Sequence, residues 1–160
     1  MSTNKKKCVA CRQREVVSCV HSIDETVSHD GQSYHVHLDN AKMSKCLNCG
    51  NTILDDETID ELYSKMRMLA GLLQPYEIKQ IRQKFGLTQK EFSSYLGVAE
   101  STLCRWETGS QIQQKSLNKM LVAFDSEPRV RHIFSDGKFT EPSHISTTQT
   151  KEIFAAAESE

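Results

Sequence analysis

The pattern of hydrophobic and polar residues over the first third of the chain predicts β-strands. Residues 14–22 contain a valine-rich run, and across residues 34–38 apolar side chains alternate with histidines. A period of two places alternate side chains on opposite faces of a strand. Between these runs lies Asp30-Gly31, a dipeptide typical of two-residue hairpin turns. Residues 1–54 are therefore expected to form a small module built on a β-hairpin.

Residues 55–73 have the pattern of a single helix that links this module to the rest of the chain. Acidic residues fill the first turns and basic residues come later, which suits the helix dipole, and Asp56 is the expected N-cap. The apolar positions are Ile59, Leu62, Met66, Leu69 and Leu73. Their spacing leaves two interpretations open: a helix packed on its own domain, or a short seam between chains or domains.

Residues 74–137 are expected to form an all-helical domain of five short helices. Pro75 suits the first position of a helix. Thr88 and Glu91 have the spacing of a capping box, which predicts the start of the second helix. Glycines follow the first three helical patterns and predict where those helices end.

The last segment, residues 138–160, is polar and rich in serine and threonine. Its composition favours a disordered tail. One apolar stretch, residues 153–157, is too short to form a stable helix by itself.

Composition and charge limit the possible functions. The 160 residues include 20 Lys+Arg, 21 Asp+Glu and 38% hydrophobic residues. No apolar run approaches the roughly 20 residues of a membrane span, and no apolar signal segment follows the lysines at positions 5–7. We therefore expect a cytoplasmic protein without a membrane partner. By segment, the net charge is −1 for residues 1–70, +2 for 71–137 and −2 for 138–160. The helical segment is thus the mildly basic one.

Cysteines are the strongest chemical signal in the chain. Disulfides are rare in the cytoplasm, so clustered cysteines there indicate metal or redox chemistry. Cys8 with Cys11 and Cys46 with Cys49 form two C-x-x-C pairs. Each pair can present two thiolates to one ion, and four sulfurs in a tetrahedron suit zinc. These four residues are expected to bind one structural Zn²⁺, and the hairpin between the pairs would bring them together.

Other chemistries are open at this stage. A redox dithiol usually shows one C-x-x-C at a helix N-terminus within an α/β pattern, which differs from this layout. A catalytic zinc keeps a position for water, which four thiolates would fill. Four histidines offer alternative ligands, although we expect them on the strand surface because the cysteines already complete a site. They are His21, His29, His35 and His37.

A bound metal changes the electrostatics of the first segment. Four thiolates and one Zn²⁺ add −2, which brings residues 1–70 to about −3. Such a charge suits a basic partner better than a phosphate. The expected fold class is α+β with two domains, a small N-terminal zinc-bound β-hairpin module and a C-terminal all-α five-helix helix-turn-helix domain.

The segment 87–109 has the layout of that helix-turn-helix. A short amphipathic helix, a Gly-Val turn and a second short helix follow one another. The second helix of such a unit lies in the major groove of DNA, where its N-terminal half reaches base edges. Val98, Leu103 and Trp106 are expected in the core. The expected DNA-binding residues are Gln89, Lys90, Glu100, Ser101, Thr102, Arg105, Gln113, Lys115 and Ser116.

Arg105 is the expected base reader, because a guanidinium can pair bidentately with guanine. The alternative for this residue is a surface salt bridge with a nearby glutamate. Ser101 and Thr102 are expected at a base or a phosphate, and Glu100 at a cytosine amino group. The remaining residues of the set are expected at backbone phosphates.

The motifs Leu-Thr-Gln, Leu-Gly-Val and Arg-Trp-Glu-Thr-Gly in this segment resemble the Xre/Cro-type helix-turn-helix. A YgiT-type zinc module followed by this unit is similar to the MqsA-type antitoxins, over residues 7–135. The resemblance implies a structural zinc module that binds a toxin, typically a small RNase. It also implies a C-terminal domain that dimerises and binds a palindrome in its own promoter. The base-contacting arginine of the family falls on Arg105, and its asparagine on Ser101, which cannot make the two-pronged adenine contact.

The sequence leaves three possible functions. The expected one is a homodimeric DNA-binding repressor that serves as the antitoxin of a small basic toxin. The second is a stand-alone zinc-containing transcription regulator without a toxin, and an adjacent gene for a small basic protein would separate the two. The third is an enzyme, which metal analysis would test, and we expect the chain not to be one.

Overall fold

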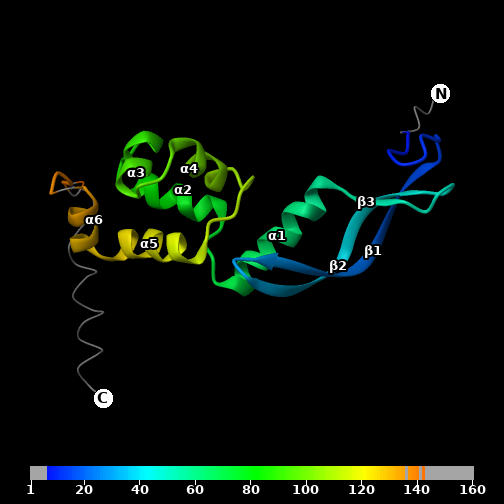
Figure 1. Cartoon of the computed structure of the whole chain (residues 1–160), viewed down its shortest axis with the longest axis horizontal. Helices are drawn as coiled ribbons and strands as arrows, with labels where there is room; N and C mark the ends of the chain where they lie inside the picture. The colour runs from blue at the N-terminus through cyan, green and yellow to red at the C-terminus, as the bar shows by residue number, and fades with distance from the viewer. Residues whose placement is uncertain (1–6, 136, 141, 143–160) are drawn as a thin grey trace, which may run out of the picture. The chain divides into compact units, whose positions relative to one another are not determined.

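The computed structural model describes residues 7–135, 137–140 and 142 (Figure 1). The chain forms two compact units. Among the described residues, the first extends to Gln74 and includes Gln113–Lys115, and the second comprises Pro75–Ile112 and the residues from Ser116 onward. An antiparallel hairpin in the first unit and several helices give the α+β class that the sequence predicts.

The first unit is built on a three-stranded antiparallel sheet in the order β1-β2-β3. Its strands are β1 (Val16–His29), β2 (Gln32–Cys46) and β3 (Thr52–Leu54). The turn falls at Asp30-Gly31, as predicted, with φ angles of 51° and 76° that match the hairpin twist. Both long strands exceed the segments expected from alternation, and β3 was not expected. Pairing between β1 and β2 extends both strands through polar residues that show no alternating apolar pattern. Strand β3 forms by pairing with β2.

One face of the sheet forms the core of the first unit with α1 (Asp56–Ala70). On β2, Val36, Leu38, Ala41 and Met43 are buried, whereas the histidines that alternate with the first two are exposed. The Thr58 hydroxyl donates to the Lys42 carbonyl at 3.0 Å and accepts from the Lys42 N–H at 2.9 Å. This double contact fixes the start of α1 on the sheet.

Helix α1 corrects two details of the expected linking helix. Its N-cap is Asp55 rather than Asp56, and the helix ends at the left-handed Gly71. Leu62 and Met66 are buried within the first unit, but Leu69 is 59% exposed. The helix therefore packs on its own unit along only part of the predicted apolar seam.

In the described residues of the second unit, α2 (Pro75–Lys84), α3 (Gln89–Tyr95) and α4 (Glu100–Glu107) are followed by α5 (Lys115–Ser126) and α6 (Pro128–Phe134). Their core is aromatic: the ring of Phe124 lies 5.4 Å from that of Phe85 and 5.1 Å from that of Phe92, edge to face. Trp106 is 2% exposed.

The start of α3 confirms the predicted capping box. The Thr88 hydroxyl accepts from the Glu91 N–H, and the Glu91 carboxylate accepts from the Thr88 N–H at 2.8 Å. These bonds satisfy donors that an isolated helix end leaves without partners.

Two further expectations concern membrane spans and the C-terminal segment. No helix in the described part is long and apolar enough to cross a membrane. The expected tail at 138–160 lies largely outside the described residues.

Candidate metal centre and nucleic-acid interface

The structure brings the four predicted cysteines to one end of the sheet. The sulfurs of Cys8, Cys11, Cys46 and Cys49 all lie within 4.8 Å of one another. The Cys8–Cys49 and Cys11–Cys46 sulfurs are 3.7 Å and 3.6 Å apart. A Zn–S bond of about 2.3 Å implies sulfur separations of about 3.8 Å in a tetrahedron. The distances match this value and are far longer than a disulfide bond.

Main-chain hydrogen bonds hold each cysteine pair in a tight turn. In the first pair, the Arg12 N–H donates to the Cys8 carbonyl at 2.9 Å, and Arg12 adopts a φ of 61°. In the second pair, the Gly50 N–H donates to the Cys46 carbonyl at 2.9 Å, with Gly50 at φ 73°. A bond from the Leu47 N–H to the Glu15 carbonyl then joins the two turns. The cluster is thus preformed by local backbone geometry.

The surroundings favour thiolates at part of the cluster. The Gln13 backbone N–H, followed by the side-chain amide of Asn48, lowers the pKa of Cys11 to about 6. At Cys49 the Asn51 N–H lowers the pKa, but the neighbouring sulfurs outweigh it and raise that pKa to about 12. A divalent cation would favour the thiolate form of all four residues. The Asn48 amide is the kind of outer contact that orients a metal ligand.

The donor set and its geometry fit one structural zinc. Four sulfurs complete a tetrahedron and leave no open position for a catalytic water. Among the described residues, none of the four histidines, nor Cys19 or Cys104, belongs to the cluster. His37 instead contacts the carboxylates of Asp24 and Asp39 at 2.8 Å and 3.2 Å, which raises its pKa.

Helices α3 and α4 have the short-helix, turn, short-helix order of a helix-turn-helix. On α4, Leu103 is fully buried and Trp106 nearly so, which confirms their predicted place in the core. Ser101 and Arg105 are exposed on the same helix, as is Glu100 at its start. Thr102 is half-buried. The helix therefore has one face fixed by packing and another that is open to a partner.

Arg105 has no ion-pair partner among the described residues, so the alternative of a surface salt bridge is not observed. The nearby glutamate of α4 is already engaged: Glu107 accepts from Arg82 at 2.6 Å and 2.9 Å. Their side chains are only 3% and 13% exposed. The Arg82 guanidinium also donates to the Leu87 carbonyl at 3.0 Å. This network ties α2 and the segment before α3 to α4.

Comparison with known proteins identifies the family. The family model described as the antitoxin component of bacterial toxin-antitoxin systems, MqsA, matches residues 6–132. The chain belongs to the MqsA antitoxin family. It is also similar to Antitoxin MqsA of Escherichia coli (strain K12), with 27% identity over 129 residues. That alignment covers 78% of this chain and 95% of the relative.

Family membership confirms the resemblance drawn from the sequence motifs and supports the assignment of a structural zinc to the cysteine cluster. The matched region includes both cysteine pairs and all of α3 and α4. It ends at residue 132, within α6, so the segment 138–160 is outside the family match.

Two of the predicted DNA-binding residues have side chains that are engaged within the first unit. Gln113 is 1% exposed, and its amide donates to the Leu73 carbonyl at 2.8 Å. This burial corrects the expectation that its side chain contacts a phosphate. Lys115 belongs to the first unit, where its ammonium donates to Gln32 and lies 5.5 Å from the Tyr34 ring centroid. Its charge is therefore already engaged.

The other residues that are expected to contact DNA phosphates differ in exposure and in the contacts they already make. Gln89 is half-buried, and its amide donates to Glu107 at 2.8 Å, so this side chain serves the internal network. Lys90 and Ser116 are exposed. Sequence reasoning missed the Arg82–Glu107 pair, because residues 25 positions apart on different helices share no local pattern.

Proposed function

We propose that this MqsA-family antitoxin represses transcription by binding DNA through α4, and that its first unit masks a basic toxin. The observation that carries the DNA-binding part is Arg105, an exposed guanidinium without an ion-pair partner in the described chain. It is presented by a helix whose opposite face is held by Leu103 and Trp106. A fixed helix with a free cation is suited to base reading in the major groove.

The other contacts follow from exposure along the same elements. Ser101 and Thr102 reach a base or a phosphate, and Glu100 accepts from a cytosine amino group. Lys90 and Ser116 contact phosphates and set the register. Gln89 acts indirectly, because its amide holds the carboxylate of Glu107.

Dimerisation completes the proposed DNA interaction. The segment 71–137 carries a net charge of only +2, which is modest for a DNA-binding domain. Two copies that bind half-sites about one helical turn apart would double the contacts and match a palindrome. Binding would then weaken steeply as the salt concentration rises. A palindrome in the chain's own promoter makes the repression autoregulatory.

The first unit supplies the antitoxin function, with zinc as a structural element rather than a catalyst. Its charge, about −3 with the metal site included, suits a basic toxin. In this scheme the cytoplasmic protein is a regulator and not an enzyme.

Substitution Arg105→Ala tests the DNA interface. We expect affinity for promoter DNA to fall by about 1–3 kcal/mol, or roughly fivefold to 150-fold, because a bidentate base contact is lost. The measurement is fluorescence anisotropy with the DNA upstream of the gene, at fixed salt. Lys119→Ala is the control, since Lys119 is exposed on α5 and its loss removes the same charge. Unchanged specific affinity for Arg105→Ala would exclude α4 as the reading helix.

A further inference from the structure

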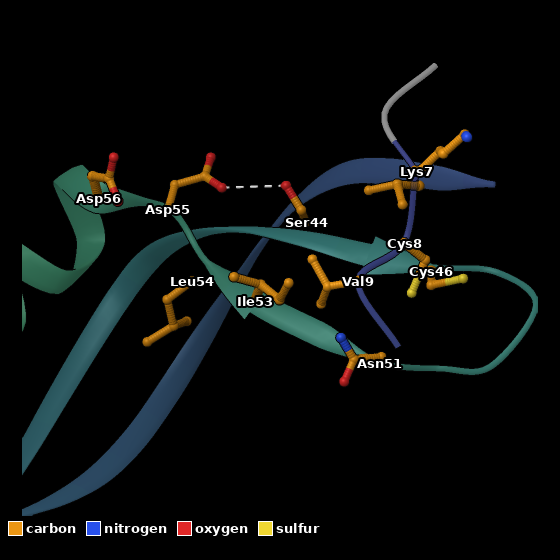
Figure 2. A pocket seen from close by; sticks show the side chains of 11 residues that line it. Lys7, Cys8, Val9, Ser44, Cys46, Asn51, Ile53, Leu54, Asp55 and Asp56 are labelled. Carbon is orange, nitrogen blue, oxygen red and sulfur yellow. Dashed lines mark hydrogen bonds between the residues drawn. The ribbon is translucent and has the colours of Figure 1, made fainter. Parts of the chain in front are cut away.

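A pocket of about 320 Å³ opens beside the cysteine cluster in the first unit (Figure 2). Its apolar lining comes from three places: Val9 in the first cysteine turn, Val16 at the start of β1, and Ile53 and Leu54 in β3. Cys8 and Cys46 also line the pocket. The zinc site and the pocket therefore share residues.

The pocket exposes apolar surface that the unit's own core does not use. Val9 is 74% exposed and Ile53 is 43% exposed. Ser44 lines the pocket, whereas Met43, next to it on β2, is buried at 7% exposure. Since successive side chains of a strand point to opposite faces, Ser44 and its cross-strand partner Ile53 lie on the face of the sheet opposite Met43. Exposed apolar clusters with a polar rim are typical of interaction sites.

The polar rim of the pocket is predominantly acidic. Asp55 and Asp56 lie on one side, and the Ser44 hydroxyl donates to the Asp55 carboxylate at 3.3 Å (Figure 2). Lys7 is the opposing cation in the lining. With zinc bound, the tetrathiolate site beneath adds −2. The pocket therefore combines an apolar centre with a negative surround.

We propose that this pocket receives an apolar side chain of the toxin that stands next to a lysine or arginine. The proposal rests on the antitoxin function proposed above and assigns the surface that performs it. The apolar side chain fills the space between Val9 and Ile53, where it displaces water from exposed carbon. The neighbouring cation meets the carboxylates of Asp55 and Asp56. An apolar anchor within a charged rim provides affinity at the centre and orientation at the edge.

The pocket and the metal cluster share the first cysteine turn. Val9 lies between Cys8 and Cys11, so a zinc ion bound by these cysteines would hold in place the wall that Val9 forms.

Two matched pairs of variants test the pocket in the full-length, zinc-loaded protein. The probe is the protein encoded by the adjacent reading frame, and its affinity is measured by isothermal titration calorimetry. Ile53→Ser is paired with Val17→Ser, because Val17 is similarly exposed, at 40%, but does not line the pocket. Val9→Ser is paired with Leu47→Ser, another exposed residue of a cysteine turn outside the lining, at 64%.

We expect each pocket variant to bind the probe at least tenfold more weakly, and each control to stay within about twofold of the wild type. A change of tenfold corresponds to about 1.4 kcal/mol, slightly less than the value for a fully buried apolar side chain. Asp56→Asn should lower the association rate and reduce its dependence on salt, whereas Glu25→Gln, an exposed acid outside the pocket, should not. Zinc content and promoter affinity should be unchanged in all six variants.

The outcomes separate the pocket from the antitoxin function. Wild-type affinity of both pocket variants overturns the pocket and leaves the function intact. Equal weakening of a pocket variant and its control also overturns it. If the wild-type chain itself does not bind the probe, both proposals fail. Should Ile53→Ser lose zinc through misfolding, Val9→Ser decides, because its side chain lies in an exposed turn.

Discussion

The two units of this chain reach stability by different physical means. In the described part of the first unit, one helix covers one face of a three-stranded sheet, and the core consists of small or aliphatic residues such as Leu38 and Ala41. The second unit buries Phe92, Trp106 and Phe124 among its helices. Aromatic side chains bury 150–250 Å² each, so a few of them bury more area than the smaller side chains between the sheet and α1. In the first unit, a metal bound by the cysteine cluster would add the cross-links that such a core lacks.

The difference also affects how each unit responds to conditions. Zinc binding to thiolates competes with protons, so the stability of the first unit should fall as the pH decreases. The second unit depends on packing and on internal polar contacts, which require no metal.

Removal of zinc should unfold the first unit and leave the second intact. The Cys46→Ser variant, or a strong chelator, removes a binding free energy that reaches about 10–16 kcal/mol in zinc-finger peptides, and in such sites that energy stabilises the fold. Hydrogen exchange should show loss of protection in β2 and α1, with unchanged protection in α5. Cys19→Ser is the control, because Cys19 is outside the cluster. If the sheet kept its protection from exchange without metal, the first unit would not depend on zinc for its stability.

Glu107→Ala should destabilise the second unit without reducing zinc content. The variant leaves the Arg82 guanidinium, with its side chain 13% exposed, without its carboxylate partner, at a cost of about 3 kcal/mol. Thermal unfolding followed by circular dichroism gives the change. Glu100→Ala, at an exposed position of the same helix, should have a much smaller effect.

The same glutamate provides a pH signature. Burial raises the pKa of Glu107, but hydrogen bonds from Arg82 and Gln89 outweigh it, and the pKa is lowered overall. The free energy that it contributes is therefore present above the unfolded pKa of about 4.3 and lost as the pH falls through the lower folded value. Glu107→Ala should lack this acid-dependent loss. An identical acid profile in both proteins would contradict a stabilising charged pair.

Thr88→Ala should have the smallest effect of the three, because it removes a single helix cap. The expected cost is about 1 kcal/mol, since the Glu91 N–H loses its acceptor. Urea unfolding of the second unit measures it. Ser94→Ala, exposed in the same helix, should stay within about 0.5 kcal/mol of the wild type. A cost equal to or above that of Glu107→Ala would contradict a larger contribution from the ion pair than from the cap.

Local signals account for the parts that the sequence predicts well. The turn at Asp30-Gly31 follows from the preference of two adjacent residues, and the start of α3 follows from Thr88 and Glu91. The two C-x-x-C pairs predict the metal cluster because each pair is a local turn. The lengths of the strands were harder to predict, because β1 continues to His29 through residues without an apolar pattern.

Burial distinguishes the residues that the sequence predicts at DNA. The sequence places Arg105 at a base and Gln113 at a phosphate, and both predictions require an accessible side chain. In the structure Arg105 is exposed, whereas Gln113 is buried and donates to Leu73. Only a contact with a residue 40 positions earlier distinguishes them.

The sequence by itself determined the hairpin turn, the two cysteine pairs and the short-helix, turn, short-helix order of residues 87–109, because turns, caps and C-x-x-C pairs depend on residues close along the chain. Tertiary structure alone decided which face of the sheet α1 covers, which leaves Ile53 and Val9 exposed beside the cluster. It also decided that Arg82 pairs with Glu107 and that Arg105 stays free of an ion pair among the described residues. These outcomes depend on side chains from distant segments competing for the same space and the same partners, and no local pattern encodes that competition.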